Sequence, residues 1–145
     1  MPSSATFTTV AHSDELHVLG ETLRPLLTIA MGSSIEVFDT TGPADAGPPP
    51  HRHPWEEIYV VLEGELDVWI DGSGTRRVGP GSVVHVPASV GHGYRNVNDA
   101  HFLTIVTHGN ASAFFAGAAT IFSDDPSDFG RLVSLAERLG VENVA

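Results

Sequence analysis

Two histidines, His51 and His53, stand two positions apart near the middle of the chain, and Pro54 follows them directly. Because proline biases the residue before it towards extended backbone, we expect both side chains to leave the same face of a strand. Two imidazoles on one face can share a metal ion. A half-exposed strand with two unrelated histidines would show the same spacing, so the pair becomes informative only together with its surroundings.

More residues of this kind follow the pair. Glu57 comes after His53 with three residues between them, and a third histidine, His92, lies in a later segment. Valines at positions 83, 84 and 86 mark a buried strand before that histidine. The glycines and proline that punctuate the two segments are Gly64, Gly81 and Pro87.

The segments GPPPHRHPWEEIYVVLEG and GSVVHVPASVGHGYRN resemble the two signature motifs of the cupin superfamily, in the same order. The resemblance implies an all-β fold, the antiparallel cupin β-barrel, also called a double-stranded β-helix or jelly roll. In two loops the sequence departs from the family pattern, because Gly47 stands nearer to the histidines and Ser89 replaces a glycine. Neither departure removes a ligand. The metal ligands that the resemblance implies are His51, His53, Glu57 and His92.

The chain contains no cysteine, so imidazole and carboxylate groups must hold any metal. Three neutral imidazoles and one carboxylate suit zinc, iron, nickel, manganese or copper, and they leave coordination positions open for water or substrate. We therefore expect one divalent metal ion. Zinc is favoured, and nickel, iron or manganese are alternatives.

Two residues are candidates for proton transfer. If Glu57 does not bind the metal, a carboxylate in an apolar cavity has a raised pKa and can act as a base. His85 lies in mid-strand among valines, seven positions before His92. If it points inward, it is a fourth imidazole ligand or an acid/base partner of the substrate. If it points outward, it is a surface histidine. The candidate catalytic residues are thus Glu57 and His85.

The elements that must position these residues are short strands. From about residue 26 the apolar residues come in strand-length runs separated by glycine, proline, aspartate and asparagine, which indicates antiparallel neighbours. The first predicted strand is Leu26–Ala30 and the last is His101–Val106. Eight or nine strands favour a closed barrel, because a single sheet would leave two open edges.

The pattern changes after Val106. Apolar residues from Phe129 to Leu139 fall on one face and predict a C-terminal helix that Gly140 ends, with Ser123 or Ser127 as its N-cap. Residues 113–119 form a second helical candidate. We expect a single cupin domain over residues 1–145, with a barrel core at about 26–108 and a helical segment at about 112–140.

The composition excludes several classes of partner. The formal charge of −11 comes from 18 acidic residues against seven arginines and no lysine, which repels phosphate backbones and anionic membranes. We expect no nucleic-acid partner and no membrane association. Residues 1–30 lack the pattern of a secretory signal, and no apolar run is long enough to span a membrane, so a cytoplasmic location is expected.

Three functions from different classes fit this sequence. The first is a metal-dependent, non-redox cyclase acting on an aromatic polyketide, because the chain resembles small bacterial cupin polyketide cyclases. The second is an oxygenase resembling quercetin dioxygenases, with a phenolic substrate. The third is a binding module that uses the metal to hold a small molecule without catalysis. In each case the partner is a small apolar or aromatic molecule, and the resemblance implies a homodimer.

Overall fold

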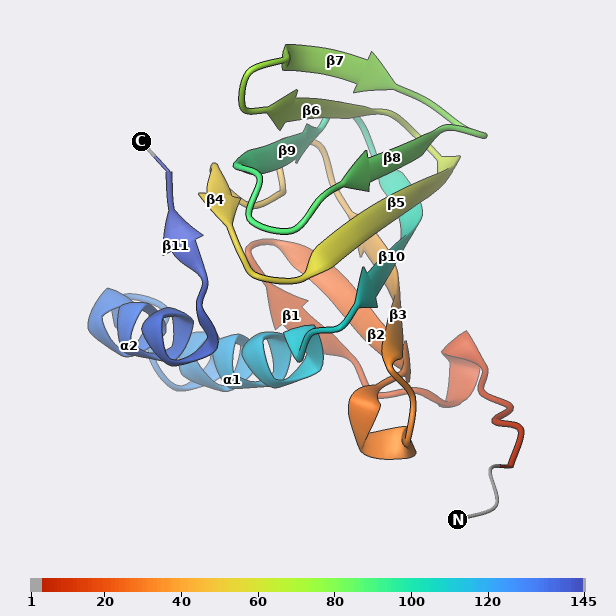
Figure 1. Cartoon of the computed structure of the whole chain (residues 1–145), viewed down its shortest axis with the longest axis vertical. Helices are drawn as coiled ribbons and strands as arrows, with labels where there is room; N and C mark the ends of the chain where they lie inside the picture. The colour runs from red at the N-terminus through yellow and green to blue at the C-terminus, as the bar shows by residue number, and fades with distance from the viewer. Residues whose placement is uncertain (1–3, 145) are drawn as a thin grey trace.

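The computed structural model describes residues 4–144, and its strands form two antiparallel sheets (Figure 1). The six-stranded sheet runs β1 (Leu16–Val18), β2 (Glu21–Leu27), β3 (Ile35–Gly42), β10 (Ala100–Thr107), β5 (Glu56–Glu63) and β8 (Val83–Val86). The five-stranded sheet runs β11 (Glu142–Asn143), β4 (His51–Arg52), β9 (His92–Asn96), β6 (Leu66–Ile70) and β7 (Gly74–Val78). Short 3₁₀ turns occupy η1 (Val10–His12) and η2 (Ile29–Met31).

The main core lies between the two sheets. Alternate residues of β10 are buried, so one face of this central strand points inward and the other outward. Phe102 from β10 and Tyr59 from β5 belong to the six-stranded sheet, and they form one apolar cluster with Leu66 and Val68 from the other sheet. Because this cluster joins both sheets, it holds them face to face around the functional residues.

The first strands lie earlier in the chain than predicted. The expected strand Leu26–Ala30 is wrong in its bounds, because β2 spans Glu21–Leu27 and a 3₁₀ turn begins at Ile29. Pro25 lies within β2, where the register with β3 shifts, and such an irregularity is where a strand tolerates proline. Pairing with β3 thus outweighs the local sequence preferences, and the β core begins well before residue 26.

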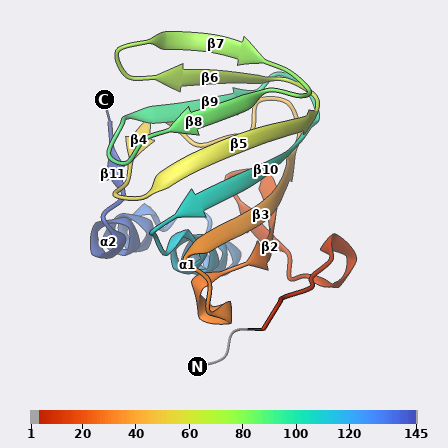
Figure 2. The same cartoon turned by 45° about the vertical axis from the view of Figure 1, so that its right-hand side comes forward.

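Two helices follow the strands, α1 (Ala111–Asp124) and α2 (Phe129–Leu139), and both lie at one end of the sheets (Figures 1 and 2). The first is longer than predicted. Gly140 ends α2 in the left-handed conformation, as its sequence position indicated. The predicted N-cap is wrong, because the Asp128 side chain accepts the Arg131 N–H. None of the helices in residues 4–144 is long and apolar enough to cross a membrane.

A buried carboxylate joins the first helix to the sheet. Glu36 on β3 is fully buried, and its oxygens accept the Ser112 N–H at 2.9 Å and the Ile29 N–H at 3.2 Å. The Ser112 hydroxyl also donates to Glu36, and the Asn110 side chain caps the helix at Ala113. Since the two backbone donors are free amides at the start of a helix and of a turn, Glu36 fixes where α1 begins beside the barrel-like core.

Candidate metal centre

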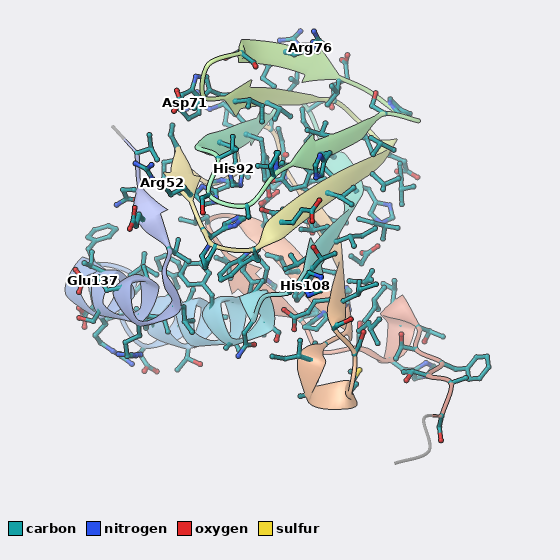
Figure 3. All side chains as sticks on the ribbon, viewed as in Figure 1. Arg52, Asp71, Arg76, His92, His108 and Glu137 are labelled. Carbon is teal, nitrogen blue, oxygen red and sulfur yellow. The ribbon has the colours of Figure 1, made fainter. Side chains whose placement is uncertain are left out.

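The structure brings together the four residues that the motifs predict as ligands. His51 on β4 lies directly opposite His92 on β9, and Glu57 projects inward from β5. One possible ligand atom from each of these residues and from His53 lies within 4.8 Å of every other. Figure 3 labels His92 at β9, and its side chain is fully buried. The cluster is therefore interior, and it is made by segments that are far apart in sequence.

Each imidazole of the cluster is fixed by a backbone carbonyl. All three use Nδ1 to donate a hydrogen bond, so Nε2 is the atom left to face the centre of the cluster. The second ring nitrogen of a metal-binding histidine is usually held in this way, which sets both tautomer and orientation. The bonds are His51 Nδ1 to Pro49 O at 2.8 Å, His53 Nδ1 to Trp55 O at 2.9 Å, and His92 Nδ1 to Val90 O at 2.8 Å.

The contacts of Glu57 show that the cluster needs positive charge. Its Oε2 lies 2.8 Å from Nε2 of His53 and 3.2 Å from Nε2 of His92. Because Nδ1 already carries the proton of the neutral ring, Nε2 would present a lone pair to a carboxylate oxygen at hydrogen-bond distance. Such an arrangement is favourable only with protons or a cation between these atoms. The donor set and the geometry both fit a divalent metal ion.

The pKa values fit a cluster that combines an ionised carboxylate with positive charge. Burial, with the neighbouring His92, lowers the pKa of His51 to about 4. Burial opposes ionisation of Glu57, but hydrogen bonds from His53 and His92 outweigh it and hold the Glu57 pKa well below its usual range. Burial also opposes protonation of His92, and its hydrogen bond to Glu57 nevertheless raises the His92 pKa. An ionised Glu57 does not support the alternative of a proton carrier with a raised pKa.

An aromatic wall closes one side of the cluster. The Trp55 indole stacks on the His53 ring with 4.5 Å between centroids and 13° between planes, and it is 5% exposed. Gly109 lets the indole lie there, because a Cβ on this glycine would come within 2.3 Å of the Trp55 side chain. Trp55 therefore shields His53 from solvent.

This stacking gives a spectroscopic prediction. An open-shell ion such as Co²⁺ or Cu²⁺ bound by the cluster is expected to quench most Trp55 fluorescence, because the indole lies against a ligand. The measurement is a fluorescence titration of Trp69→Phe, in which Trp55 is the sole tryptophan. The matched control is Trp55→Phe, in which quenching of Trp69 should be much weaker. Equal quenching of both tryptophans would contradict a metal site at His53.

His85 does not join the cluster. Val86, its neighbour on β8, is buried opposite Glu57, so the alternation of the strand turns His85 outward. Its side chain is 52% exposed and pairs with Glu56 on the outer face. The interpretation of His85 as an inward-facing ligand or acid/base is therefore corrected. The four residues of β8 are three valines and one histidine, so both faces of the strand carry valine. The sequence therefore did not show which way His85 points.

The structure contains a further buried carboxylate, Glu21, that the sequence motifs do not mark. Glu21 at the start of β2 is 3% exposed; its Oε1 accepts the Tyr94 hydroxyl at 2.5 Å and its Oε2 accepts Asn96 Nδ2 at 3.2 Å. Burial raises the pKa of Glu21 to about 7, although these two hydrogen bonds act in the opposite direction. No local motif marks Glu21, because its partners come from a strand more than 70 positions later.

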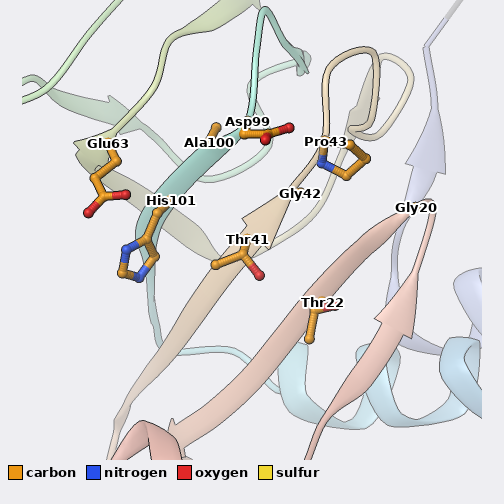
Figure 4. Close-up of a pocket in the computed structure, with 9 residues that line it drawn as sticks. All are labelled: Gly20, Thr22, Thr41, Gly42, Pro43, Glu63, Asp99, Ala100 and His101. Atoms are coloured by element: carbon orange, nitrogen blue, oxygen red, sulfur yellow. The ribbon is translucent and has the colours of Figure 1, made fainter.

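Two surface cavities lie away from the metal cluster. One of about 430 Å³ lies beside β2, β3 and β10, and Figure 4 shows Thr22, Thr41 and His101 among its lining residues. The Nε2 atom of His101 lies 2.5 Å from a carboxylate oxygen of the buried Asp39. Another of about 440 Å³ lies between α1 and α2. Neither is lined by any of the four candidate ligands.

Residues 38–107 match the family model described as a cupin domain, and all four candidate ligands fall inside this range. This segment is a cupin domain. The resemblance drawn from the two motifs is thus confirmed. The three imidazoles and one carboxylate of this domain suit several divalent ions.

Two curated proteins match about half of the chain. The cupin domain is similar to dimethylsulfoniopropionate lyase DddQ from Ruegeria pomeroyi, with 41% identity over 73 residues, 50% of this chain and 36% of the lyase. It is also similar to quercetin 2,3-dioxygenase from Bacillus subtilis, with 34% identity over 71 residues, 48% of this chain and 20% of that enzyme. The matched region thus spans about a third or less of each of these longer proteins.

Solved structures share the fold over more of the chain. The polyketide cyclase RemF from Streptomyces resistomycificus aligns with a TM-score of 0.64 and 21% identity, over 91% of this chain and 99% of that protein. KdgF from Halomonas sp. aligns with a TM-score of 0.65 and 19% identity, over 74% and 98% of the two chains. At these identities the comparison shows the cupin fold alone.

Proposed function

We propose that this chain is a metal-dependent enzyme that holds one divalent cation, zinc in the first instance, inside its cupin barrel. The observation that carries the proposal is the fixed orientation of three imidazoles, whose Nε2 atoms converge on an ionised carboxylate. A merely structural cluster of buried histidines would not need all three rings to turn the same nitrogen inward. The proposed ligands are His51, His53, Glu57 and His92.

The reaction that we propose is the closure of a ring in an aromatic polyketide. A bound divalent cation would act as a Lewis acid that polarises a carbonyl group of the poly-β-ketone. Removal of a proton next to that carbonyl, carbon–carbon bond formation and loss of water would complete an intramolecular aldol condensation. Within the chain, Trp55 and Tyr59 exclude water from the interior, and the Tyr94–Glu21 pair can hold or release a proton there.

Two considerations support the cyclase over other cupin activities. The alignment with RemF extends over 91% of this chain, which includes more than the cupin domain itself. The core cluster between the two sheets is apolar, and apolar surroundings suit a substrate that must fold without contact with water. The proposed chemistry therefore rests on the metal cluster, and the proposed substrate class rests on the fold shared with RemF.

The deciding experiment measures turnover and oxygen together. We expect purified protein to contain about one equivalent of divalent metal by elemental analysis, and to convert an aromatic poly-β-ketone equally well with and without oxygen. Chelation followed by readdition of Zn²⁺ should remove and restore the activity. Oxygen uptake at the rate of turnover would contradict the cyclase. The substrates to be tested also include dimethylsulfoniopropionate, because 73 residues of this chain are 41% identical to dimethylsulfoniopropionate lyase DddQ.

A quercetin dioxygenase-like oxygenase is the second candidate. The observation in its favour is 34% identity over 71 residues with quercetin 2,3-dioxygenase. The same ligands accept nickel, iron or manganese as well as zinc, so a redox-capable ion in the purified protein and oxygen uptake on a flavonol would support it. If neither substrate class is turned over by protein that retains its metal, a non-catalytic binding function remains.

We also propose that the chain forms a homodimer through the outer face of the six-stranded sheet. This face is apolar along its centre, and no helix within residues 4–144 covers it (Figure 2). Val83 is 66% exposed and Ile35 is 42% exposed, and apolar side chains that gather on one face mark association sites, whereas single ones are normal. A second copy is the occupant that we favour, because the centre of this face, at Ile58, Leu103 and Ile105, is uncharged and avoids the repulsion that a net charge of −11 imposes elsewhere.

The proposed dimer can be tested by a substitution in its interface. Ile105→Lys, in the central strand of that face, is expected to convert a dimer into a monomer, because two lysines would be buried without partners. The measurement is molar mass by light scattering during size-exclusion chromatography. Thr75→Lys on the exposed β7 is the matched control and should leave the mass unchanged. A wild-type protein that is monomeric at about 100 μM would contradict the proposal.

A further inference from the structure

We propose that the C-terminal strand β11 is a functional part of the metal centre, where it positions the ligand His51. The proposal rests on the metal site proposed above. It assigns a role to residues 140–144, which lie outside the cupin domain match and far from the ligands in sequence.

The strand that carries His51 has little support of its own. β4 contains only His51 and Arg52, and its pairing with β9 consists of the single register pair His51 with His92. On its other side β4 pairs with β11, where Asn143 lies opposite His51 and Glu142 lies opposite Arg52. Figure 1 shows β11 alongside β4, so the C-terminal strand covers an edge that would otherwise be open.

Specific polar contacts hold the two strands together. The Val144 N–H donates to the Pro50 carbonyl at 3.0 Å, directly before His51. The Arg52 guanidinium lies 3.3 Å from a carboxylate oxygen of Glu142. The backbone bond anchors the end of β11, whereas the ion pair is exposed and contributes little by itself. The backbone of Val144 is therefore the contact that fixes the segment leading into His51.

The rest of the C-terminal segment follows the first motif closely. Gly140 lies against Pro54, since a Cβ on this glycine would be 3.2 Å from the proline ring. Val141 packs against the apolar cluster that contains Trp55, and the Trp55 indole stacks on His53. Val144 packs near Gly91, where an added Cβ would be 3.5 Å from its side chain. Residues 140–144 thus run beside the entire stretch from Pro50 to Trp55.

His51 is the ligand that most needs such support. His53, Glu57 and His92 are each no more than 5% exposed and sit in the packed core, whereas His51 is only partly buried. Its ring makes one hydrogen bond, to a carbonyl in the proline-rich loop before it. A two-residue strand without an edge partner opens easily. Docking of β11 therefore keeps the fourth donor in place, and its release would leave a site of three ligands.

The experiment compares two substitutions at one position. Val144→Pro removes the N–H that bonds to Pro50, whereas Val144→Ala shortens the side chain and keeps that N–H. We expect Val144→Pro to weaken Zn²⁺ binding about 10–100-fold in a chelator competition, which is the typical cost of losing an outer-shell partner. Val144→Ala should change it by less than about threefold.

A second readout uses the metal-free protein. In Val144→Pro, amide exchange at Arg52 should accelerate and the imidazole resonances of His51 should shift, while those of His92 stay in place. Equal Zn²⁺ affinity in Val144→Pro and wild type, or equal weakening in both variants, would overturn the proposal. A wild type that binds no metal would instead overturn the proposed function. In that case the exchange and imidazole data still decide whether β11 positions His51.

Discussion

His92→Ala is expected to lose high-affinity metal binding and all metal-dependent activity. His92 is fully buried, its ring lies 4.4 Å from that of His51 and 4.8 Å from that of His53, and no other imidazole can take its place. Loss of a direct ligand costs more than the roughly 10–100-fold that loss of an outer-shell partner costs. The measurement is Zn²⁺ affinity by chelator competition, together with the metal content of protein purified without added metal.

His85→Ala is the matched control for this substitution. It also removes one imidazole, seven positions earlier, but from the outer face, where His85 pairs with Glu56. Metal affinity and content should equal those of the wild type. If His85→Ala lowered the affinity as much as His92→Ala does, the inward cluster would not be the metal site.

Loss of a fully buried side chain can also disturb folding, so the test needs a second ligand. His51→Ala removes the least buried of the four ligands and should leave the free energy of unfolding of the metal-free protein nearly unchanged. It should still weaken metal binding strongly. Retention of full affinity in a folded His51→Ala would show that the ion, if bound, is held by other groups.

The ligand set could be predicted because the residues that identify it lie close together in the sequence. His51, His53 and Glu57 lie within seven consecutive positions, and a single short motif contains both His92 and the strand-forming segment before it. The motif order then implies that the two segments meet. The pairing of His51 directly with His92 gives the physical reason, since one strand register places both rings in the same interior.

The direction of His85 could not be read from the sequence. An alternating strand shows its buried face by the contrast between apolar and polar residues, but β8 reads Val-Val-His-Val. Val83 is 66% exposed and Val86 is fully buried, so residues of the same type occupy both faces. The exposed valine belongs to the apolar outer face of the sheet. The apolar outer face thus removes the alternation of apolar and polar residues from which the direction of His85 would be predicted.

Other features were missed because their partners are distant in sequence. β11 has two exposed residues and exists only because the edge of β4 is available to it. Glu21 lies in a segment without apolar period, and its partners Tyr94 and Asn96 are on the opposite sheet. Neither β11 nor Glu21 has a local sequence signal, because contacts in the assembled fold hold each of them in place.

Glu21→Gln is expected to stabilise the metal-free protein at pH 8 and to leave its stability almost unchanged at pH 4.5. Burial raises the folded-state pKa of Glu21 from 4.5 to about 7. Below pH 4.5 the carboxyl is protonated in both states, so ionisation costs nothing. Between pH 4.5 and 7 the unfolded chain ionises first, and stability falls as the pH rises.

Above pH 7 the folded protein carries the full cost of a buried carboxylate, about 3 kcal/mol for a shift of this size. Glutamine keeps the side-chain shape and can accept the Tyr94 hydroxyl, but it has no proton to lose. The gain in the free energy of unfolding should therefore grow across this pH window and level off near pH 8. The measurement is urea unfolding of both proteins in the presence of a chelator.

The control for this prediction is Glu63→Gln, because Glu63 is exposed at the end of β5. Its effect on stability should be small and independent of pH. A constant difference between Glu21→Gln and wild type from pH 4.5 to 8 would show that Glu21 is ionised throughout. The Tyr94–Glu21 pair would then have no proton to exchange near neutral pH, and its proposed part in the cyclisation would be lost while the metal cluster stood unaffected.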